Sequence, residues 1–151
     1  MSDRGQKAYD YFMQGYNCCQ AVVLAYSDLT GLNDETGSLI ASGFGGGIGR
    51  TRSVCGTVSG MVMVANMLRG YSDPKDSAGK KETYQMIQQL LDKFKEQNGS
   101  IICAELLGLK PMESTNPTPS ERTDEYYKKR PCPLLCKDAA EILESYLEEN
   151  Q

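Results

Sequence analysis

The sequence predicts an all-α fold, a single-domain bundle of six or seven helices over residues 1–151, with a glycine-rich loop at a cysteine-lined site. Apolar residues recur three or four positions apart through much of the chain, which is the spacing of a helix face. No segment alternates β-branched and polar residues over the length of a strand. With 151 residues, 40% of them hydrophobic, one domain can bury a core without cross-links.

Glycines and caps divide the first part of the chain. The predicted helices there cover residues 3–14, 18–29 and 33–42. The first helix stops at Gly15 and the second before Gly31, because glycine commonly ends helices. Asn33 or Asp34 caps the third. We therefore expect three amphipathic helices ahead of the glycine-rich run.

The glycine-rich run covers residues 43–49, with five glycines in seven positions, and predicts a loop with unusual backbone angles. The helix that follows begins at position 53 or 54 and ends at Leu68. It is apolar on most sides, so we place it at the centre of the domain. Gly56 and Gly60 give it small surfaces where another helix or a ligand can approach closely.

The second half of the chain contains longer amphipathic segments. We predict a helix at 80–97, a short helix at 100–107, an exposed connection at about 111–131 and a last helix at 133–149. The first and the last of these helices have apolar residues three or four apart with charges between them. The connection holds four of the six prolines, so we expect it to be poorly packed.

Four of the six cysteines stand where a helix is predicted to begin: Cys18, Cys55, Cys103 and Cys132. Their neighbours are favoured at helix starts, among them Asn17 and two serines as caps and Pro133 in the first turn. A helix N-terminus carries partial positive charge, so we expect the pKa of these thiols to be lowered. Thiolates bind metals and perform redox chemistry.

The two other cysteines are less clear. Neighbouring residues on a helix point about 100° apart, so one of Cys18 and Cys19 faces the site, and we choose Cys18 because it is nearer the cap. Cys132 and Cys136 share a helix face, which makes Cys136 a spare ligand, a resolving thiol or a buried apolar residue. Free cysteines are often small buried hydrophobes, but packing alone gives no reason for their position at helix starts.

Composition excludes several classes of function. The absence of histidine rules out Cys–His hydrolases and mixed Cys/His zinc sites. The net charge of −4 and the lack of a basic stripe speak against nucleic-acid binding. No apolar run reaches the roughly 20 residues of a membrane span. The polar first residues lack the apolar stretch of a signal peptide, so we expect a cytoplasmic protein.

The glycine loop is not preceded by a strand or followed by Gly-Lys-Ser/Thr, so a nucleotide site is a weak interpretation. We expect the amides of Gly45, Gly46 and Gly47 to line the cysteine site instead, since successive N–H groups can form an anion-binding nest. Arg50 and Arg52 add positive charge there or are simply exposed. The basic run at residues 126–130 docks a partner or is a solvated surface.

Several segments together resemble the redox-active family that is named for its C-GCAxxG-C-C pattern. The segments are Asn17-Cys18-Cys19-Gln20-Ala21, Phe44-Gly45-Gly46-Gly47-Ile48-Gly49-Arg50, Cys55-Gly56-Thr57-Val58-Ser59-Gly60, Gly99-Ser100-Ile101-Ile102-Cys103, and Cys132 with Ala139-Ala140-Glu141-Ile142-Leu143. The resemblance covers nearly the whole chain. It implies a bacterial or archaeal redox protein whose four characteristic cysteines are Cys18, Cys55, Cys103 and Cys132.

The resemblance also implies a type of centre. A related domain occurs in split-Soret type cytochromes, where an iron–sulfur centre accompanies haem, but this chain has no Cys-x-x-Cys-His motif and haem is not expected. The chain departs from the family pattern at Thr57, where alanine is usual, and in carrying Cys19 and Cys136. These departures leave open whether the site is a plain four-thiolate cage.

We therefore expect an iron–sulfur cluster held by Cys18, Cys55, Cys103 and either Cys132 or Cys136, and electron transfer to a redox partner protein. Alternatives are a structural four-cysteine zinc site and a thiol–disulfide oxidoreductase that needs no cofactor. We favour an electron carrier or another redox protein over a hydrolase or a transferase. The sequence leaves the oligomeric state open, and a homodimer is one alternative.

Overall fold

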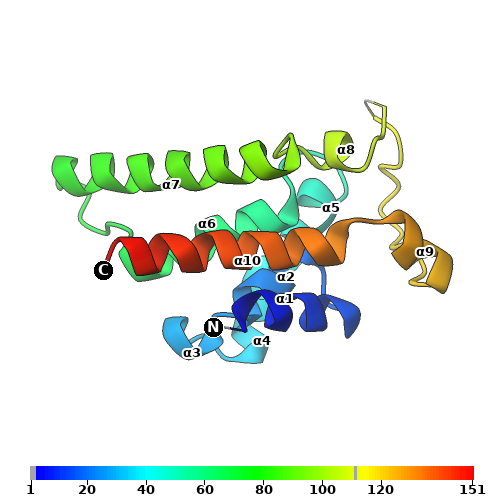
Figure 1. Cartoon of the computed structure of the whole chain (residues 1–151), viewed down its shortest axis with the longest axis horizontal. Coiled ribbons are helices and arrows are strands. Elements are labelled where there is room, and N and C mark those ends of the chain that lie inside the picture. The colour runs from blue at the N-terminus through cyan, green and yellow to red at the C-terminus, as the bar shows by residue number, and fades with distance from the viewer. Residues whose placement is uncertain (1–2, 111) are drawn as a thin grey trace.

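The all-α prediction is confirmed. The computed structural model describes residues 3–110 and 112–151, and within them the only β-type pairing is a single bridge between Val54 and Ile102. The helices shown in Figure 1 are α1 (Arg4–Met13), α2 (Cys18–Leu24), α3 (Ser27–Thr30), α4 (Asp34–Ala41), α5 (Gly45–Ile48), α6 (Gly56–Arg69), α7 (Ser77–Asn98), α8 (Cys103–Leu106), α9 (Asp124–Lys129) and α10 (Cys132–Glu149), with a 3₁₀ turn η1 at Ser42–Phe44.

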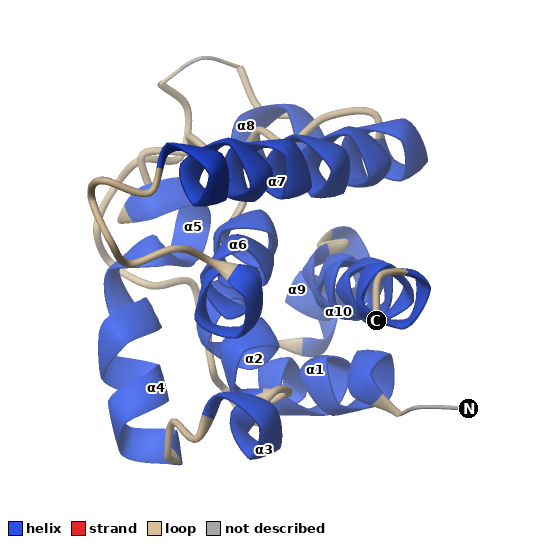
Figure 2. Cartoon of the chain, turned by 90° about the vertical axis from the view of Figure 1, so that its left-hand side faces the viewer, coloured by secondary structure: helices blue, strands red, loops and turns tan. Residues whose placement is uncertain are grey.

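Helices α2 and α6 form the middle of the bundle. Helix α1 packs along α10, α2 contacts α1, α4 and α6, and α7 covers α6 and α10 (Figure 2). The largest fully buried side chains are Phe12, Tyr26, Met61, Leu90, Phe94 and Leu143. Short elements α5, α8 and α9 lie at one end of the bundle, where α10 begins (Figure 1).

Two glycines of α6 allow it to approach α2 closely. A Cβ atom at Gly56 would lie 2.9 Å from the Phe44 carbonyl oxygen and 3.1 Å from the Cys18 Cβ. A Cβ atom at Gly60 would lie 2.9 Å from the Cys19 carbonyl oxygen. The small surfaces expected on this helix therefore face α2, and Gly56 places the start of α6 against Cys18.

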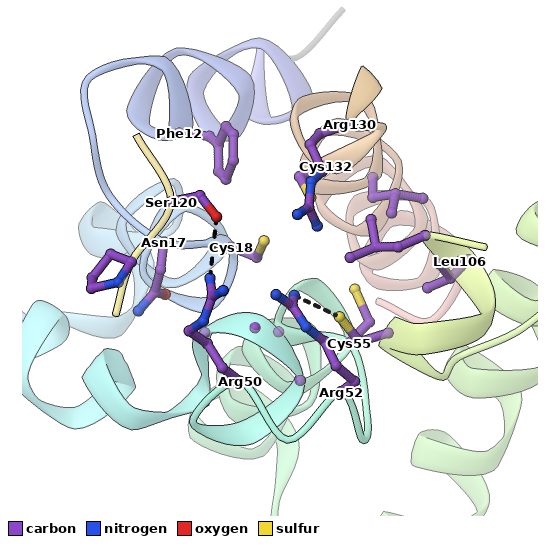
Figure 3. A pocket seen from close by; sticks show the side chains of 18 of the residues that line it. Phe12, Asn17, Cys18, Arg50, Arg52, Cys55, Leu106, Ser120, Arg130 and Cys132 are labelled. Atoms are coloured by element: carbon purple, nitrogen blue, oxygen red, sulfur yellow. Dashed lines mark hydrogen bonds between the residues drawn. The ribbon is translucent and has the colours of Figure 1, made fainter. Parts of the chain in front are cut away.

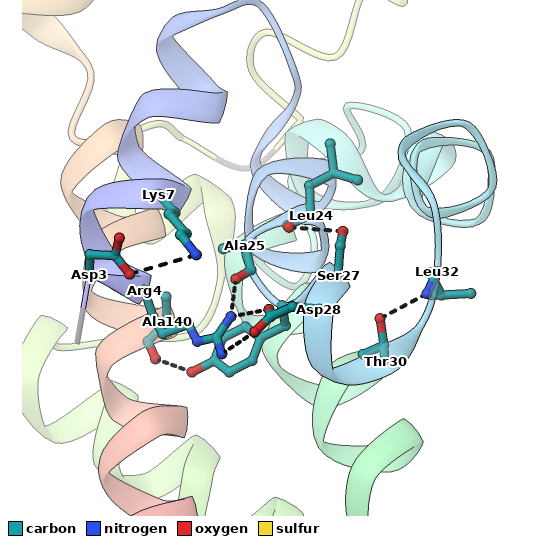
Figure 4. Close-up of polar contacts among 11 residues, drawn as sticks. Asp3, Arg4, Lys7, Leu24, Ala25, Ser27, Asp28, Thr30, Leu32 and Ala140 are labelled. Atoms are coloured by element: carbon teal, nitrogen blue, oxygen red, sulfur yellow. Dashed lines mark hydrogen bonds and ion pairs between the residues drawn. The ribbon is translucent and has the colours of Figure 1, made fainter.

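A polar contact network ties α1 to the rest of the bundle (Figure 4). The Arg4 guanidinium donates to both carboxylate oxygens of Asp28 and to the Ala25 carbonyl oxygen at 2.9 Å. It also lies 4.8 Å from the ring centroid of Tyr26, whose buried hydroxyl donates to the Ala140 carbonyl at 2.7 Å. This network joins α1, the α2–α3 connection and α10.

Some predicted helix bounds are wrong. The expected helix at 18–29 is divided, with α2 ending at Leu24 and α3 starting at Ser27. The Ser27 hydroxyl donates to the Leu24 carbonyl at 2.9 Å, a local bond that competes with continued helix. The expected helix at 100–107 shortens to α8, because residue 102 is held in the bridge with Val54.

The connection expected at about 111–131 contains one short helix and one anchoring side chain. Pro111 lies outside the described residues, but α9 occupies part of the rest. The Arg122 guanidinium donates to the carbonyls of Phe12 and Tyr16 and lies 4.0 Å from the Phe12 ring centroid. These contacts anchor the connection on the end of α1 at Arg122, while most of its other described residues are exposed.

Candidate functional site

The four cysteines singled out in the sequence line one cavity. Cys18, Cys55, Cys103 and Cys132 come from four separate segments, and all contribute to the wall of a cavity of about 410 Å³. It lies at the end of the bundle where α10 begins, and Figure 3 shows its labelled side chains pointing into a common space. A cavity of this volume falls within the range of small-ligand and cofactor pockets.

Each of these cysteines stands at a helix start, as predicted. Cys18, Cys103 and Cys132 are the first residues of α2, α8 and α10, and Cys55 immediately precedes α6. Asn17 caps α2, where its side chain accepts from the Gln20 N–H at 2.9 Å and the Gln20 side chain accepts from the Asn17 N–H at 3.0 Å. This capping box fixes the position of Cys18.

Backbone pairing brings two of the cysteines together. The Val54–Ile102 bridge aligns the segments ahead of α6 and α8. The Cys55 N–H donates to the Ile101 carbonyl at 2.8 Å, and the Cys103 N–H donates to the Ser53 carbonyl at 2.7 Å. Residues almost fifty positions apart in the sequence are therefore held side by side by their main chains.

The glycine-rich run adopts a left-handed turn. Five consecutive residues have positive φ angles: Gly46 (67°), Gly47 (73°), Ile48 (65°), Gly49 (59°) and Arg50 (65°). Side chains resist this conformation, which explains the glycines. Gly45, Gly46, Gly47 and Gly49 line the cavity. The N–H groups of residues 49 to 53 donate to carbonyls within the run, so its free amides must come from earlier positions.

The expected lowering of the thiol pKa values is wrong, because burial outweighs the helix termini. Burial raises the pKa of Cys55 to about 11 although the Thr57 hydroxyl, 3.1 Å from its sulfur, favours the thiolate. Burial also raises the pKa of Cys103, although the positive charge of Arg52 acts to lower it. Donation of a hydrogen bond toward Cys18, together with burial, raises the pKa of Cys132. Each of these shifts favours the neutral thiol over the thiolate in the metal-free protein.

Cys18 lies at the centre of a thiol group. Both Cys132 and Cys136 influence its pKa, and the Cys136 sulfur lies 3.8 Å from its carbonyl oxygen. The influence of Cys132 favours the Cys18 thiolate, but Cys136 and burial outweigh it, so the pKa of Cys18 is raised well above its ordinary value. Cys18 is thus influenced by two cysteines of α10, and all six cysteines are free.

Cys19 and Cys136 have different surroundings. Cys19 is completely buried beside Met63, with 3.6 Å between the two sulfur atoms, and does not line the cavity. This agrees with the choice of Cys18 as the residue facing the site. Cys136 is also completely buried, one turn behind Cys132, and lies against the Cys18 carbonyl at 3.8 Å.

Arg52 supplies the positive charge of the site. Its side chain is only 6% exposed, so the interpretation of Arg52 as a solvated charge is wrong. Nη1 donates to the Cys103 sulfur at 3.6 Å and Nε to the Ser114 carbonyl at 3.0 Å. The buried Nη2 has no hydrogen-bond partner among the described residues. A buried guanidinium with an unused donor favours the binding of an anion, because a buried charge without a partner is energetically unfavourable.

Several residues of the cavity were not recognised from the sequence. Arg122, Tyr126 and Arg130 line it from the connection and α9, and Arg130 had been assigned to a charged surface run. Thr57, fully buried against Cys55, was noted only as a departure from a family pattern. The available signal was the density of arginines near the cysteines in a chain of net negative charge.

The arrangement is not that of a preformed site for one metal ion. Within residues 3–110 and 112–151, no three Cys, Asp or Glu side chains are grouped so as to hold a single ion. The donor set nevertheless suits a larger sulfur-ligated group, because four thiols and an unpartnered guanidinium face one cavity. Across the described helices, none has the length and apolar character required to cross a membrane.

Comparison with known proteins agrees with this geometry. The profile of the family described as "Putative redox-active protein (C_GCAxxG_C_C)" matches residues 16–146, a span that includes all six cysteines. Comparisons with curated proteins and with solved structures give no match. The chain therefore belongs to the family of C_GCAxxG_C_C redox-active proteins.

Proposed function

We propose that Cys18, Cys55, Cys103 and Cys132 ligate one iron–sulfur cluster and that the protein transfers electrons. One observation carries this proposal: four cysteines from distant segments line a single cavity beside a buried guanidinium that lacks an anion. Four thiolates are the usual ligand set of two-iron and four-iron clusters. When bound, such a cluster accepts and releases single electrons.

The surrounding residues suit an anionic redox centre. Arg52 donates toward the Cys103 sulfur, and the Thr57 hydroxyl lies 3.1 Å from the Cys55 sulfur. Hydrogen bonds to sulfur and a nearby positive charge stabilise the reduced, more negative state and raise its reduction potential. Leu106, Leu135 and Phe12 in the wall limit the access of water.

Cys132 is the proposed fourth ligand. It lines the cavity, whereas Cys136 lies one turn further along α10 and is completely buried. Cys136 supports the centre through its contact with the Cys18 carbonyl at 3.8 Å. A single zinc ion is a weaker alternative, because Zn–S bonds of about 2.3 Å require four closely grouped sulfurs, and no such group is present among the described residues.

The test is anaerobic reconstitution of the full chain with iron and sulfide, followed by metal and sulfide analysis and absorption spectroscopy. We expect a brown protein with a reversible one-electron couple. Single Cys→Ser changes at 18, 55, 103 and 132 should abolish or destabilise the cluster, while Cys19→Ala serves as the matched control and should retain it. A colourless protein with six intact thiols after reconstitution would refute the proposal, and zinc without iron would select the structural alternative.

A second candidate is a thiol–disulfide oxidoreductase, favoured by the influence of Cys132 and Cys136 on the Cys18 thiol and by the contact of Cys136 with the Cys18 carbonyl. The Cys18 thiolate would attack a substrate disulfide, releasing one substrate thiol, and Cys132 or Cys136 would displace the second to leave an internal disulfide. The raised thiol pKa values oppose fast attack. Peptide mapping after mild oxidation tests it: a Cys18 disulfide together with turnover of a disulfide substrate is required.

A further inference from the structure

The cysteine cavity contains an excess of positive charge. Arg50, Arg52, Arg122 and Arg130 line it, and no aspartate or glutamate does. None of the four arginines is in an ion pair with a described residue. The whole chain carries a net charge of −4, so this concentration of unpaired cations is a local feature.

The described partners of these guanidinium groups are neutral. Arg50 donates to the Asn116 carbonyl at 2.6 Å and to the Ser120 hydroxyl at 3.5 Å. Arg122 donates to main-chain carbonyls, as described above. Arg130 lies over the ring of Tyr126, 5.4 Å from its centroid. Carbonyls, hydroxyls and rings orient a guanidinium but do not neutralise it.

Three of the cations converge. Figure 3 shows the side chains of Arg50, Arg52 and Arg130 directed toward the same part of the cavity. Burial and the charges of Arg52 and Arg130 lower the pKa of Arg50. Like charges held together without a counterion are unfavourable, and Arg52, which lines this cavity, is 6% exposed and has an unpartnered Nη2.

A cluster alone does not balance this charge. A cluster with four thiolate ligands carries a net charge of about −2. Four arginines therefore leave about two positive charges uncompensated even with a cluster bound, and all four uncompensated without it. Arg52 is the arginine that contacts a ligand sulfur, whereas Arg50 bonds to the Ser120 side of the cavity.

We infer that the cavity binds a small organic anion, with its carboxylate between the guanidinium groups of Arg50, Arg52 and Arg130. Guanidinium forks match carboxylate oxygens in geometry and bind them through paired hydrogen bonds. The remaining wall includes Phe12, Leu106, Leu107 and Tyr126, which suits a short apolar body in place of a bare inorganic ion. This ligand site goes beyond the proposed function and does not depend on the cluster.

The test is calorimetric titration at low salt with three probes: benzoate, neutral benzamide of the same shape, and inorganic phosphate. We expect benzoate to bind and benzamide not to bind. Arg130→Gln and Arg50→Gln should each weaken benzoate binding about tenfold or more, because each removes a charged hydrogen-bond donor. Arg69→Gln, the same change at an arginine that does not line the cavity, should leave binding unchanged.

Titrations are performed on both the cluster-loaded protein and the reduced metal-free protein, so a failure to form a cluster leaves the second titration decisive. Equal binding of benzoate and benzamide, or unchanged benzoate binding in Arg130→Gln, would overturn the inference. Binding that is lost on cluster loading would show that the arginines serve the cluster alone. Phosphate binding as tight as benzoate would overturn the assignment to an organic anion. Circular dichroism confirms that each variant is folded.

Discussion

Gly47 and Cys103 are packed so closely that a Cβ atom at position 47 would lie 2.6 Å from the Cβ of Cys103. The same added atom would lie 2.7 Å from the main-chain nitrogen of Ser53. Gly47 also has a φ angle of 73°, in the left-handed region. The glycine-rich turn is thus built against the segment that presents Cys103, and the absence of a side chain at position 47 is a condition for that contact.

Gly47→Ala should therefore destabilise the metal-free protein by about 3 kcal/mol, since the left-handed conformation and the overpacking each cost about 1–2 kcal/mol. Urea unfolding of the reduced protein measures this change. Gly43→Ala is the matched control in the same run, because an added Cβ there meets no atom within 4 Å. Equal stability of the two variants would contradict the close packing of Gly47.

The positions of four cysteines at helix starts could be predicted from the sequence because the signals are local. Asn17 and Gln20 form the capping box that fixes Cys18, and Pro133 lies in the first turn after Cys132. The all-α fold class could be predicted because apolar residues recur three or four positions apart within each helix, and this spacing does not depend on contacts with other helices. The direction of neighbouring residues on a helix separates Cys18 from Cys19, and Cys19 is completely buried in the structure.

The rest depends on contacts between distant segments. Arg130 follows two exposed lysines, so the sequence pattern indicates a charged surface. Only the fold shows that Arg130 lines the cavity. The sign of the thiol pKa shifts depends on burial, which is set by helices elsewhere in the chain. The shortened α8 follows from the bridge at Ile102, and a bridge to Val54 leaves no pattern in either segment.

Thr57→Val should lower the reduction potential of the proposed cluster without loss of iron. Thr57 is fully buried, and its hydroxyl lies 3.1 Å from the Cys55 sulfur. Loss of a hydrogen bond of about 1.5 kcal/mol to a sulfur that becomes more negative corresponds to roughly 65 mV in a one-electron couple. Anaerobic redox titration measures the shift. Thr57→Ser keeps the hydroxyl and should stay near the wild-type potential, so equal potentials in the Val and Ser variants would count against this hydrogen bond.

Tyr26→Phe should reduce the free energy of unfolding by about 1 kcal/mol. The change removes the buried hydroxyl that donates to the Ala140 carbonyl at 2.7 Å, while the ring can remain in the core beneath Arg4. Tyr127→Phe is the control, since its hydroxyl has no hydrogen bond to a described residue and its ring contacts Phe12 and Tyr126. Urea unfolding distinguishes them; an effect of the same size in Tyr127→Phe would mean that the Tyr26–Ala140 bond contributes nothing specific.

The ion pair between Arg4 and Asp28 should make stability depend on pH in acid. Hydrogen bonds from Arg4 lower the pKa of Asp28 to about 2, below the value of about 3.9 in an unfolded chain. The unfolded state therefore takes up the proton first as pH falls, so the contribution of Asp28 is present above pH 4 and is lost between about pH 4 and pH 2. The Asp28 side chain is 56% exposed, so the effect is small and is screened by salt. The unfolding free energies of wild type and Asp28→Asn at low salt should differ at pH 5 and converge toward pH 2. A difference that stays constant with pH would show that Arg4 does not recognise the charge of the carboxylate.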